Sequence, residues 1–565
     1  MGLSEHQIQE LIILGLVFFV SLMSALALTP LADRLAWKIG LVDSPGGRKN
    51  HPSCVTRAGG VAMALAMLLT LGVMLKWNSE LAAYWSAVAI LLFTGLVDDK
   101  YRLSSRHKFP AQILAIILFM YLGGVWLEDL GDILGIGSLQ LGSLAPWLTV
   151  FAMVGVINAF NMSDGLDGLA AGLGGIACLF FIPFAYAQES WIYLLILTGF
   201  FGSLLGFLRY NVQPARLFMG DAGSMFLGFS LAAAAVVLTQ GEVRGVQEYQ
   251  PITALIILSL PIADTLAVIF RRLRQGQDLF KPDKNHLHHR LMGLGLSYQV
   301  TVSLIYGLMF IIGLCAWLVR PWPEWVQFYS LVGFYVLLYG GIWRLEKRAA
   351  NFNPVIYDII ANGSARGSSS RTMAFMARHA NKIFTVVWLG FLLPAVPAGN
   401  SSGMGILYYV FFIFLLTGIY YPWKGQKKHM PIAHGLMFFA IFSILVVYSA
   451  KFAASYWFIP YMTTITAVAA IWTVIRVWST PRLKTLLPGS FELLLLGAAI
   501  VSPVLVHYSL DIDESFRIFL ILSFVFSIPL FMMIKAYLRR NPRYNRRFIS
   551  YLMFVLLLLL VMAYF

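Results

Sequence analysis

The sequence predicts an all-α membrane protein that crosses the bilayer many times. Of its 565 residues, 59% are hydrophobic and only 12% are charged, and the mean hydropathy is +0.77. A soluble chain of this length needs about twice that share of charged residues to cover its surface. Apolar segments of about 20 residues, the length of one transmembrane helix, recur along the whole chain, and counting them gives about 18 spans.

The first apolar segment predicts a transmembrane helix and not a cleaved signal peptide, and the cysteines predict no covalent or metal framework. Residues 11–31 are too long for the core of a signal peptide and follow no basic region, so we expect a retained span. The three cysteines, Cys54, Cys178 and Cys315, lie far apart and form no CxxC pair. They predict neither a disulfide framework nor a zinc site.

The loops between the spans divide by charge. When the spans are threaded alternately across the bilayer with the N-terminus outside, the loops rich in Lys and Arg fall on one side. In the first half of the chain these are residues 34–57, 98–108, 209–221 and 271–290, and residues 161–167, which carry no Lys or Arg, fall on the same side. Residues 128–144 and 241–250, which are poor in Lys and Arg, fall opposite. The positive-inside rule makes the basic side cytoplasmic. The net charge of +15 therefore reflects membrane topology, anionic lipid and bound anionic substrate, and not nucleic-acid binding.

The chain divides into two blocks of spans around residues 346–382. That segment carries Asn, Gly, Ser and Arg without a clear apolar period and predicts a cytoplasmic linker. Residues 1–345 form a predicted bundle of about 10–11 spans, and residues 383–565 form a block of about seven. The unusual polar clusters fall in the first block, on its cytoplasmic side.

The strongest functional signal is a polar cluster where one span ends and the next begins. Two amides and two carboxylates follow at intervals of three residues: Asn158, Asn161, Asp164 and Asp167. Such groups are costly beside hydrocarbon unless they face a cavity, a partner or an ion. Gly165 and Gly168 let the backbone break there and approach a ligand closely. A helix end wetted by lipid headgroups is the alternative, and four polar groups around two glycines make it the weaker interpretation.

A second signal is the acid pair Asp98 and Asp99 at the end of an apolar span. Adjacent carboxylates at a membrane face can hold a metal ion, position a cation or act as a base with a raised pKa. A solvated helix end capped by charges explains this motif, taken alone, equally well.

A third signal is Asp221, which lies among glycines at the start of a span, with Ser224 three residues later. The pattern is typical of a helix N-terminus with free backbone N–H groups, which bind phosphate. A carboxylate beside them can hold Mg²⁺ against that phosphate. An ordinary N-cap aspartate is the alternative, and the preceding cations Arg209 and Arg216 favour the ligand site.

The fourth signal is a loop with three imidazoles and a cation: His286, His288, His289 and Arg290. Zinc would need further ligands at defined spacing, and the neighbouring lysines favour a phosphorylated ligand instead. A solvated loop is the remaining alternative. On the same face, an upstream loop adds Lys49, His51 and Arg57, and Asp264 is one more acid near a span end, either structural or supporting the site.

Together these clusters predict phosphoryl transfer at the membrane surface. Mg²⁺ typically binds through one or two protein groups plus substrate phosphates. Catalysis of phosphoryl transfer consists mostly of positioning and charge neutralisation. The place of the clusters at the bilayer surface implies that one reactant is a lipid.

The motifs resemble, in their order, those of the polyprenyl-phosphate N-acetylhexosamine-1-phosphate transferase family, or glycosyltransferase family 4. This family includes the undecaprenyl-phosphate GlcNAc-1-phosphate transferases and the MraY translocase of peptidoglycan synthesis. The resemblance covers residues 1–320 and rests on residues 48–60, 98–99, 158–168, 219–224 and 286–290. The last motif has the form seen in the GlcNAc-transferase branch, which implies a UDP-N-acetylhexosamine as donor.

The resemblance implies a role for each candidate residue. Mg²⁺, with Mn²⁺ as a substitute, would be held by Asn161 and Asp221. Asp98 and Asp99 would be the catalytic residues that engage or deprotonate the lipid phosphate, and which of them is the base, if either is, stays open. The implied substrate-binding residues are Lys49, His51, Arg57, Asn158, Asp164, Asp167, Arg216, His286, His288, His289 and Arg290.

In the implied reaction, undecaprenyl phosphate attacks the sugar-bound phosphorus of the UDP-sugar, UMP leaves, and the lipid-linked sugar starts an O-antigen, an exopolysaccharide or a cell-wall polymer. The implied location is the bacterial inner membrane, with the active site on its cytoplasmic face. The family domain would end near residue 345, so the resemblance says nothing of the last block. A homodimer contact, a partner in polysaccharide assembly and handling of the lipid product are open roles for it.

Two other functions stay open. A transporter or flippase of lipid-linked sugars also has intramembrane acids and many spans, but its polar residues would follow a path through the membrane instead of gathering on one face. A catalytically inactive scaffold for polysaccharide assembly is disfavoured by the intact acids Asp98, Asp99 and Asp221.

Overall fold

A computed structural model describes residues 5–43, 54–240, 250–278 and 285–349. All of these residues belong to one compact unit, Leu3–Phe352. The described residues form twelve α-helices, one short 3₁₀ helix and a two-stranded hairpin, so the predicted all-α class is confirmed. The predicted block at residues 383–565 and residues 350–382 of the predicted linker lie outside the described residues. The total of about 18 spans therefore stays a prediction.

The elements follow one another as α1 (Glu5–Ile39), β1 (Val42–Asp43), β2 (Val55–Thr56), α2 (Gly59–Met74), α3 (Ser79–Tyr101), α4 (Ser105–Gly123), η1 (Gly142–Leu144), α5 (Ala145–Ser163), α6 (Leu169–Ala187), α7 (Trp191–Asn211), α8 (Gly220–Gln240), α9 (Pro251–Gln275), α10 (Leu287–Gly293), α11 (Tyr298–Leu318) and α12 (Glu324–Ala349). Nine of the described helices are long and apolar enough to cross a membrane, and α2 is a shorter apolar helix. This part of the chain is a multi-pass membrane protein.

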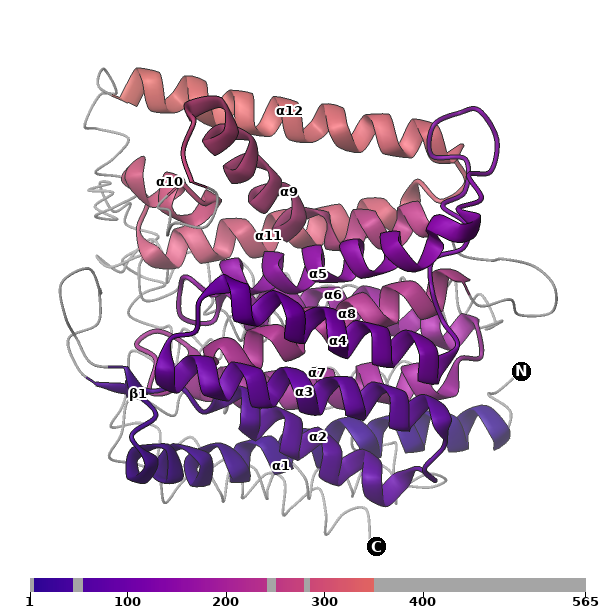
Figure 1. Ribbon diagram of the computed structural model, residues 1–565, viewed down its shortest axis with the longest axis vertical. Helices are drawn as coiled ribbons and strands as arrows, with labels where there is room; N and C mark the ends of the chain where they lie inside the picture. The colour runs from indigo at the N-terminus through magenta and orange to yellow at the C-terminus, as the bar shows by residue number, and fades with distance from the viewer. Residues whose placement is uncertain (1–4, 44–53, 241–249, 279–284, 350–565) are drawn as a thin grey trace, which may run out of the picture. The chain divides into compact units, whose positions relative to one another are not determined.

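The long helices lie side by side, with α6, α7 and α8 in the interior and α1 and α12 at opposite margins (Figure 1). In the three interior helices, 89% of the most apolar stretch is buried within the protein, compared with 11% in α12. A helix that is apolar all round must be covered either by other helices or by lipid. The interior helices are covered by other helices, and the marginal helices face lipid along much of their surface.

Helix α8 lies at the centre of the helix packing, because it contacts α2, α3, α5 and α6. Glycines allow this close approach. A Cβ placed on Gly60 would lie 2.2 Å from the Cα of Gly223, and one placed on Gly95 would lie 2.2 Å from the Cα of Ala222. The contact at Gly95 brings the end of α3, which carries the acid pair, against the start of α8.

The close contact at Gly95 predicts that a larger side chain at this position will lower the stability of the protein. Gly95→Ala should destabilise the protein by about 1–3 kcal/mol, because the new methyl group would overlap the backbone of Ala222. The measurement is the midpoint of thermal unfolding in detergent. Gly155→Ala in α5 is the matched control, since a methyl group added there would meet no atom within 4 Å. Equal stability of the two variants would contradict the close contact between α3 and α8.

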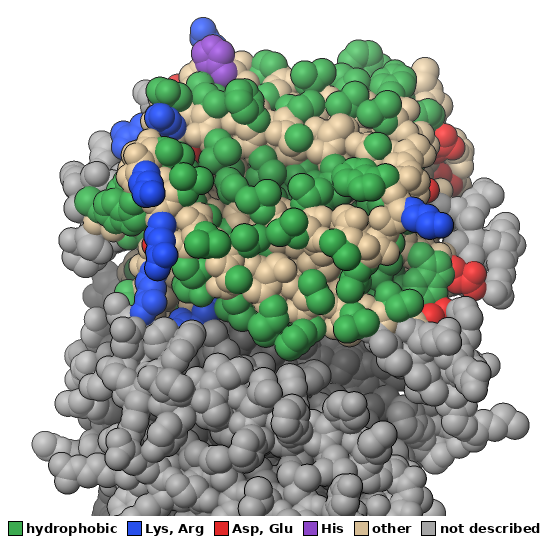
Figure 2. Space-filling view, turned by 90° about the horizontal axis from the view of Figure 1, so that it is seen from below, with side chains coloured by type: hydrophobic (Ala, Val, Ile, Leu, Met, Phe, Trp, Pro, Cys, Tyr) green, Lys and Arg blue, Asp and Glu red, His purple; other side chains and the backbone are tan. Residues whose placement is uncertain are grey.

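One lateral face of the unit is a broad apolar band between two polar edges (Figure 2). On this face, most Lys and Arg side chains lie along one edge, and the visible Asp and Glu side chains gather mainly at the other. The two ends of the helices therefore differ in charge, as the division of the loops predicts.

Candidate functional site

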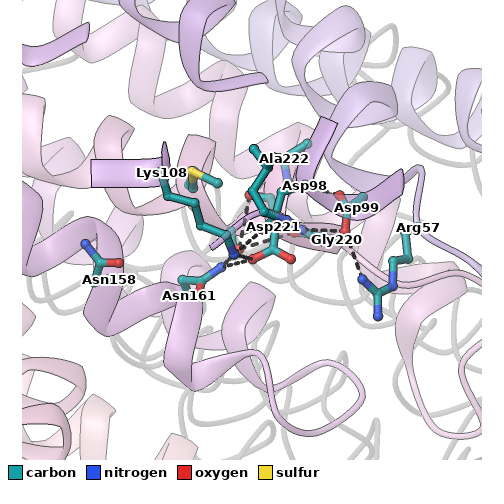
Figure 3. Close-up of polar contacts among 12 residues, drawn as sticks. Arg57, Asp98, Asp99, Lys108, Asn158, Asn161, Gly220, Asp221 and Ala222 are labelled. Carbon is teal, nitrogen blue, oxygen red and sulfur yellow. Dashed lines mark hydrogen bonds and ion pairs between the residues drawn. The ribbon is translucent and has the colours of Figure 1, made fainter. Parts of the chain in front are cut away.

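Four of the residues predicted from the sequence meet where the ends of three helices converge (Figure 3). Asp98 and Asp99 lie in the last turn of α3, Asn161 in the last turn of α5 and Asp221 in the first turn of α8. Because α8 packs against both α3 and α5, polar motifs that are far apart in the sequence form one cluster.

Asp221 has the most accessible of the three carboxylates. Its side chain is 23% exposed, compared with 3% for Asp98 and 0% for Asp99. Its Oδ1 accepts a hydrogen bond from Nδ2 of Asn161 (2.7 Å), which also donates to Oγ of Ser224 (2.7 Å). Asn161 and Asp221, the two predicted metal ligands, are thus in direct contact, and Asp221 is the acid best placed to meet a ligand from outside.

Lys108, in the first turn of α4, is a site residue that the sequence motifs did not reveal. Its ammonium group contacts the carboxylate of Asp98 and lies 3.3 Å from Oδ1 of Asp221. Oδ1 of Asp98 accepts a hydrogen bond from the backbone N–H of Leu103 (2.6 Å). One cation therefore bridges two carboxylates. The available signal was a lysine at the start of the span that follows the acid pair, since a charge at such a place needs a partner.

Asp99 fixes the start of α8 instead of facing a ligand. Its two oxygens accept hydrogen bonds from the backbone N–H groups of Asp221 (3.0 Å) and Ala222 (3.2 Å). Nη1 of Arg57 lies 3.4 Å from Oδ1 of Asp99. The expectation that the start of α8 offers free N–H groups to a phosphate is wrong for these two groups. A carboxylate is stabilised by the partial positive charge of a helix N-terminus, so Asp99 joins α3 to α8.

The hairpin of β1 and β2 positions Arg57. Val42 and Thr56 pair across the hairpin, and the carbonyl of Thr56 accepts a hydrogen bond from the backbone N–H of Phe218 (2.8 Å). The hairpin is thereby attached to the segment that leads into α8. Nη2 of Arg57 lies 3.2 Å from Oδ1 of Asp43, so its guanidinium connects the hairpin to Asp99.

Residues 164–168, here called the acidic loop, are held by contacts from three sides. Oδ2 of Asp167 accepts a hydrogen bond from the backbone N–H of Ala215 (3.0 Å). The backbone N–H of Gly168 donates to Oδ1 of Asn211 (2.8 Å). The hydroxyl of Tyr298 donates to the carbonyl of Asp167 (2.7 Å). The predicted substrate contact Asp167 therefore has partners within the protein that set the shape of this loop.

Asp164 begins the acidic loop and is half-buried. Burial raises the pKa of its carboxyl well above the usual range, and the neighbouring carboxylates, Asp221 first among them, raise it further. Each of these effects opposes a negative charge on Asp164. A cation bound nearby would relieve the repulsion, so the electrostatics of the site favour a positively charged ligand.

The histidine motif forms α10 and the residue before it. Nδ1 of His286 lies 2.9 Å from Oδ2 of Asp264, and the backbone N–H of Leu287 donates to Oδ1 of the same carboxylate (2.7 Å). His288 is buried, and burial lowers its pKa to about 3, so its ring is neutral near pH 7. The ring lies against the acidic loop, because a Cβ placed on Gly165 would be 2.4 Å from Nε2 of His288.

The remaining members of the histidine motif lie on α10. The ring centroid of His289 is 4.2 Å from that of His288. Nε of Arg290 donates to Oε1 of Glu346 in α12 (2.8 Å). Arg290, predicted to contact substrate, is therefore paired with a carboxylate of the protein.

Of the other predicted residues, Asn158 and Arg216 are not brought into the cluster of Asp98, Asp99, Asn161 and Asp221. Lys49 and His51 lie outside the described residues. Nδ2 of Asn158 donates to Oε1 of Gln112 (2.9 Å), a pairing between α5 and α4 of the kind that joins membrane helices, and Figure 3 shows Asn158 apart from the carboxylates. Arg216 lies in the segment before α8, where its backbone N–H bonds to the end of α7.

A hard cation at the cluster of Asp98, Asp99, Asn161 and Asp221 would take few of its ligands from the protein. Within the described residues, no group of three or more His, Cys, Asp and Glu side chains is arranged to hold a metal ion. Mg²⁺ needs fewer, because substrate phosphates and water complete its coordination. The position between Asp98 and Asp221 already accepts a cation, the ammonium group of Lys108. This donor set fits a metal that arrives with a phosphorylated substrate.

Comparison with known proteins gives consistent matches. The sequence profile described as glycosyl transferase family 4 matches residues 81–239. This range contains Asp98, Asp99, Asn161 and Asp221. A relative from Bacillus subtilis (strain 168), named probable undecaprenyl-phosphate N-acetylglucosaminyl 1-phosphate transferase, is 36% identical over 324 residues, which are 57% of this chain and 89% of the relative.

Enterobacterial relatives give the same match. The undecaprenyl-phosphate alpha-N-acetylglucosaminyl 1-phosphate transferase of Escherichia coli O157:H7 is 33% identical over 337 residues, 57% of this chain and 88% of the relative. The protein of the same name from Yersinia pestis is 32% identical over 336 residues, which are 57% of this chain and 89% of the relative.

Proposed function

The chain belongs to glycosyl transferase family 4, and from this we propose that it transfers N-acetylglucosamine 1-phosphate from UDP-N-acetylglucosamine to undecaprenyl phosphate. An oxygen of the lipid phosphate forms a bond to the sugar-bound phosphorus. The bond from that phosphorus to the oxygen of the uridine phosphate breaks, and UMP leaves with the electron pair. The lipid-linked sugar then begins a glycan such as an O-antigen, an exopolysaccharide or a cell-wall polymer.

The observation that carries this proposal is the array of Asp98, Lys108 and Asp221 at one end of the membrane helices. Both substrates bring phosphate groups, so the site must neutralise their charge and align them. Lys108 is a flexible cation able to move from the carboxylates to a phosphate. The array lies at the helix ends, where a lipid headgroup and a soluble nucleotide can meet.

Asp221 and Asn161 are the residues that would hold Mg²⁺, or Mn²⁺ in its place. Their contact and the exposure of Asp221 support this assignment. The metal would supply charge neutralisation at the pyrophosphate of the donor. Burial is the main cause of the raised pKa of Asp164, and the neighbouring carboxylates, Asp221 first among them, raise it further. The negative charge of these carboxylates supports a cation at this site.

The two adjacent aspartates have different roles in this proposal. Asp98 shares Lys108 with Asp221, so it is placed to orient that lysine and to accept the remaining proton of the lipid phosphate. Asp99 and Arg57 hold the start of α8 in place. His288, which is neutral and packed on the acidic loop, supports the donor side of the site.

The location that follows is the bacterial inner membrane, with the site on the cytoplasmic face. The separation of basic and acidic edges supports this orientation (Figure 2), and a UDP-sugar is a cytoplasmic metabolite that must reach the site from that side. A homodimer, partners in polysaccharide assembly and a role for residues 383–565 stay predictions. A transporter is not favoured, because Asp98, Asp99, Asn161 and Asp221 gather at one end of the described helices.

The proposal is tested with purified protein, undecaprenyl phosphate and a panel of radiolabelled UDP-sugars. We expect sugar phosphate to enter the lipid fraction, with one UMP released for each sugar, and UDP-N-acetylglucosamine to be the best donor. EDTA should abolish transfer and added Mg²⁺ should restore it. Folded protein that binds UDP-sugars but transfers none of them would contradict the transferase. Transfer that survives EDTA would contradict the metal assignment alone.

A further inference from the structure

The short helix α10 is held by carboxylates from two different membrane helices. Asp264 of α9 binds its N-terminal end through His286 and the backbone of Leu287. Glu346 of α12 binds its other end through Arg290. In Figure 1, α9 runs obliquely from the bundle toward α12, and α10 lies beside them. The position of α10 is therefore set from both ends by polar contacts.

The contact between Arg290 and Glu346 is bidentate. Nε of Arg290 lies 2.8 Å from Oε1 of Glu346, and Nη2 lies 2.9 Å from Oε2. The same guanidinium lies 5.7 Å from the ring centroid of Tyr339. Pairing with Glu346 is the main cause of the raised pKa of Arg290. Two parallel charge-assisted hydrogen bonds fix both distance and orientation, so this pair can position a helix.

One face of α12 makes these attachments. The hydroxyl of Tyr335 lies 2.7 Å from Oγ of Ser259, and that of Tyr339 donates to Oδ1 of Asp264 (3.2 Å). Tyr335, Tyr339 and Glu346 are spaced by four and seven residues, which places them along one side of a helix. Most of the remaining surface of α12 is open, so these few contacts determine how α12 and α10 lie relative to each other.

Helix α10 places the buried ring of His288 against Gly165 of the acidic loop. Within the part of the chain that the structure describes, Nε2 of His288 is buried and has no hydrogen-bond partner. A small hollow beneath α10 is lined by His288, Ser163, Leu169 and Asp264, among others. Leu287 and His288, in the first turn of α10, line this hollow and are buried. The contacts of Asp264 and Glu346 add polar restraints on α10 to that packing.

We propose that Glu346 is a positioning residue for donor binding, and that Arg290 acts through Glu346 by anchoring α10 and does not itself contact the substrate. Glu346 holds Arg290, Arg290 holds α10, and α10 sets His288 against the acidic loop. This inference rests on the proposed function, because that function places the acidic loop, with Asp164 and Asp167, on the donor side of the site.

The test is a double-mutant cycle of Arg290→Ala and Glu346→Ala, measured as kcat/KM for UDP-N-acetylglucosamine. We expect each single variant to lose roughly 10–100-fold, as displacement of a positioning group does. The double variant should lose no more than the worse single variant, because both changes remove the same contact. Glu346→Asp should recover most of the activity. Lys347→Ala is the matched control, since its ammonium lies over the ring of Trp343 (4.0 Å from the centroid), and it should behave as wild type.

A second readout reports on the helix itself. Amide hydrogen exchange in residues 287–293 should quicken in Arg290→Ala and in Glu346→Ala, and stay unchanged in Lys347→Ala. Losses that multiply in the double variant, or a Glu346→Ala protein with wild-type activity and exchange, would overturn the proposal and return Arg290 to direct substrate contact. If wild-type protein transfers no sugar phosphate, the proposed function fails, and the exchange measurement still decides whether Glu346 anchors α10.

Discussion

Asp221→Asn will lower kcat for sugar-phosphate transfer by about 10²–10³-fold, the scale seen when one preorganised electrostatic group is removed from an active site. The substitution preserves size and an oxygen acceptor for Asn161, and it removes the one negative charge of the cluster that is substantially exposed. We therefore expect the unfolding temperature to stay close to that of the wild type. The measurement is radiolabelled sugar phosphate entering lipid at saturating concentrations of both substrates.

The matched control for this variant is Asp132→Asn. Asp132 lies in the loop between α4 and α5, and its Oδ1 accepts a hydrogen bond from the backbone N–H of Gly137 (2.8 Å). It is far from the carboxylate cluster along both adjoining helices, so its activity should equal that of the wild type. Substantial activity in Asp221→Asn at saturating Mg²⁺ would remove Asp221 from the metal assignment.

Asp98→Asn and Asp99→Ala will separate catalysis from folding. Asp98→Asn should lower kcat by about 10²–10³-fold, because the charge that holds Lys108 is lost. It should change stability little, because the amide oxygen can still accept the hydrogen bond from Leu103. Asp99→Ala should destabilise the protein by about 2 kcal/mol, as the loss of a strong helix cap does, since the backbone N–H groups of Asp221 and Ala222 lose their acceptor.

Both variants are compared by thermal unfolding in detergent and by transfer per folded molecule. A strongly destabilised Asp98→Asn, or a fully stable Asp99→Ala, would contradict the division of roles. Lys108→Met provides a check on the first result. It removes the cation that Asp98 orients, so its kcat should fall to a level near that of Asp98→Asn, and the double variant should be little worse.

The outcome for single residues shows what a linear pattern can and cannot resolve. Asn161 and Asp221 were expected in one site, and the structure joins their side chains. Asp99 was grouped with Asp98 because the two are adjacent in sequence, although successive residues on a helix point about 100° apart. That rotation sends one carboxylate to Lys108 and the other to the start of α8.

Several predicted ligand-binding residues have partners inside the protein. Asn158, Asp167 and Arg290 carry groups suited to a ligand, and the structure pairs them with Gln112, Ala215 and Glu346. At or within a membrane, a polar side chain can be stabilised by a ligand or by a neighbouring segment of the protein. Sequence spacing cannot distinguish these cases when the partner lies on a distant segment.

The sequence by itself determined the all-α membrane class, the charge difference between the two ends of the helices and the carboxylate and amide residues that meet at the helix ends. These properties depend on composition, on the length of apolar segments and on local motifs, each of which is readable along one stretch of chain. Only the tertiary structure decided which polar groups share a partner, that Lys108 bridges Asp98 and Asp221, and that Glu346 reaches α10. The physical reason is that these contacts join side chains across helices whose relative rotation is set by close packing at glycines such as Gly95 and Gly60.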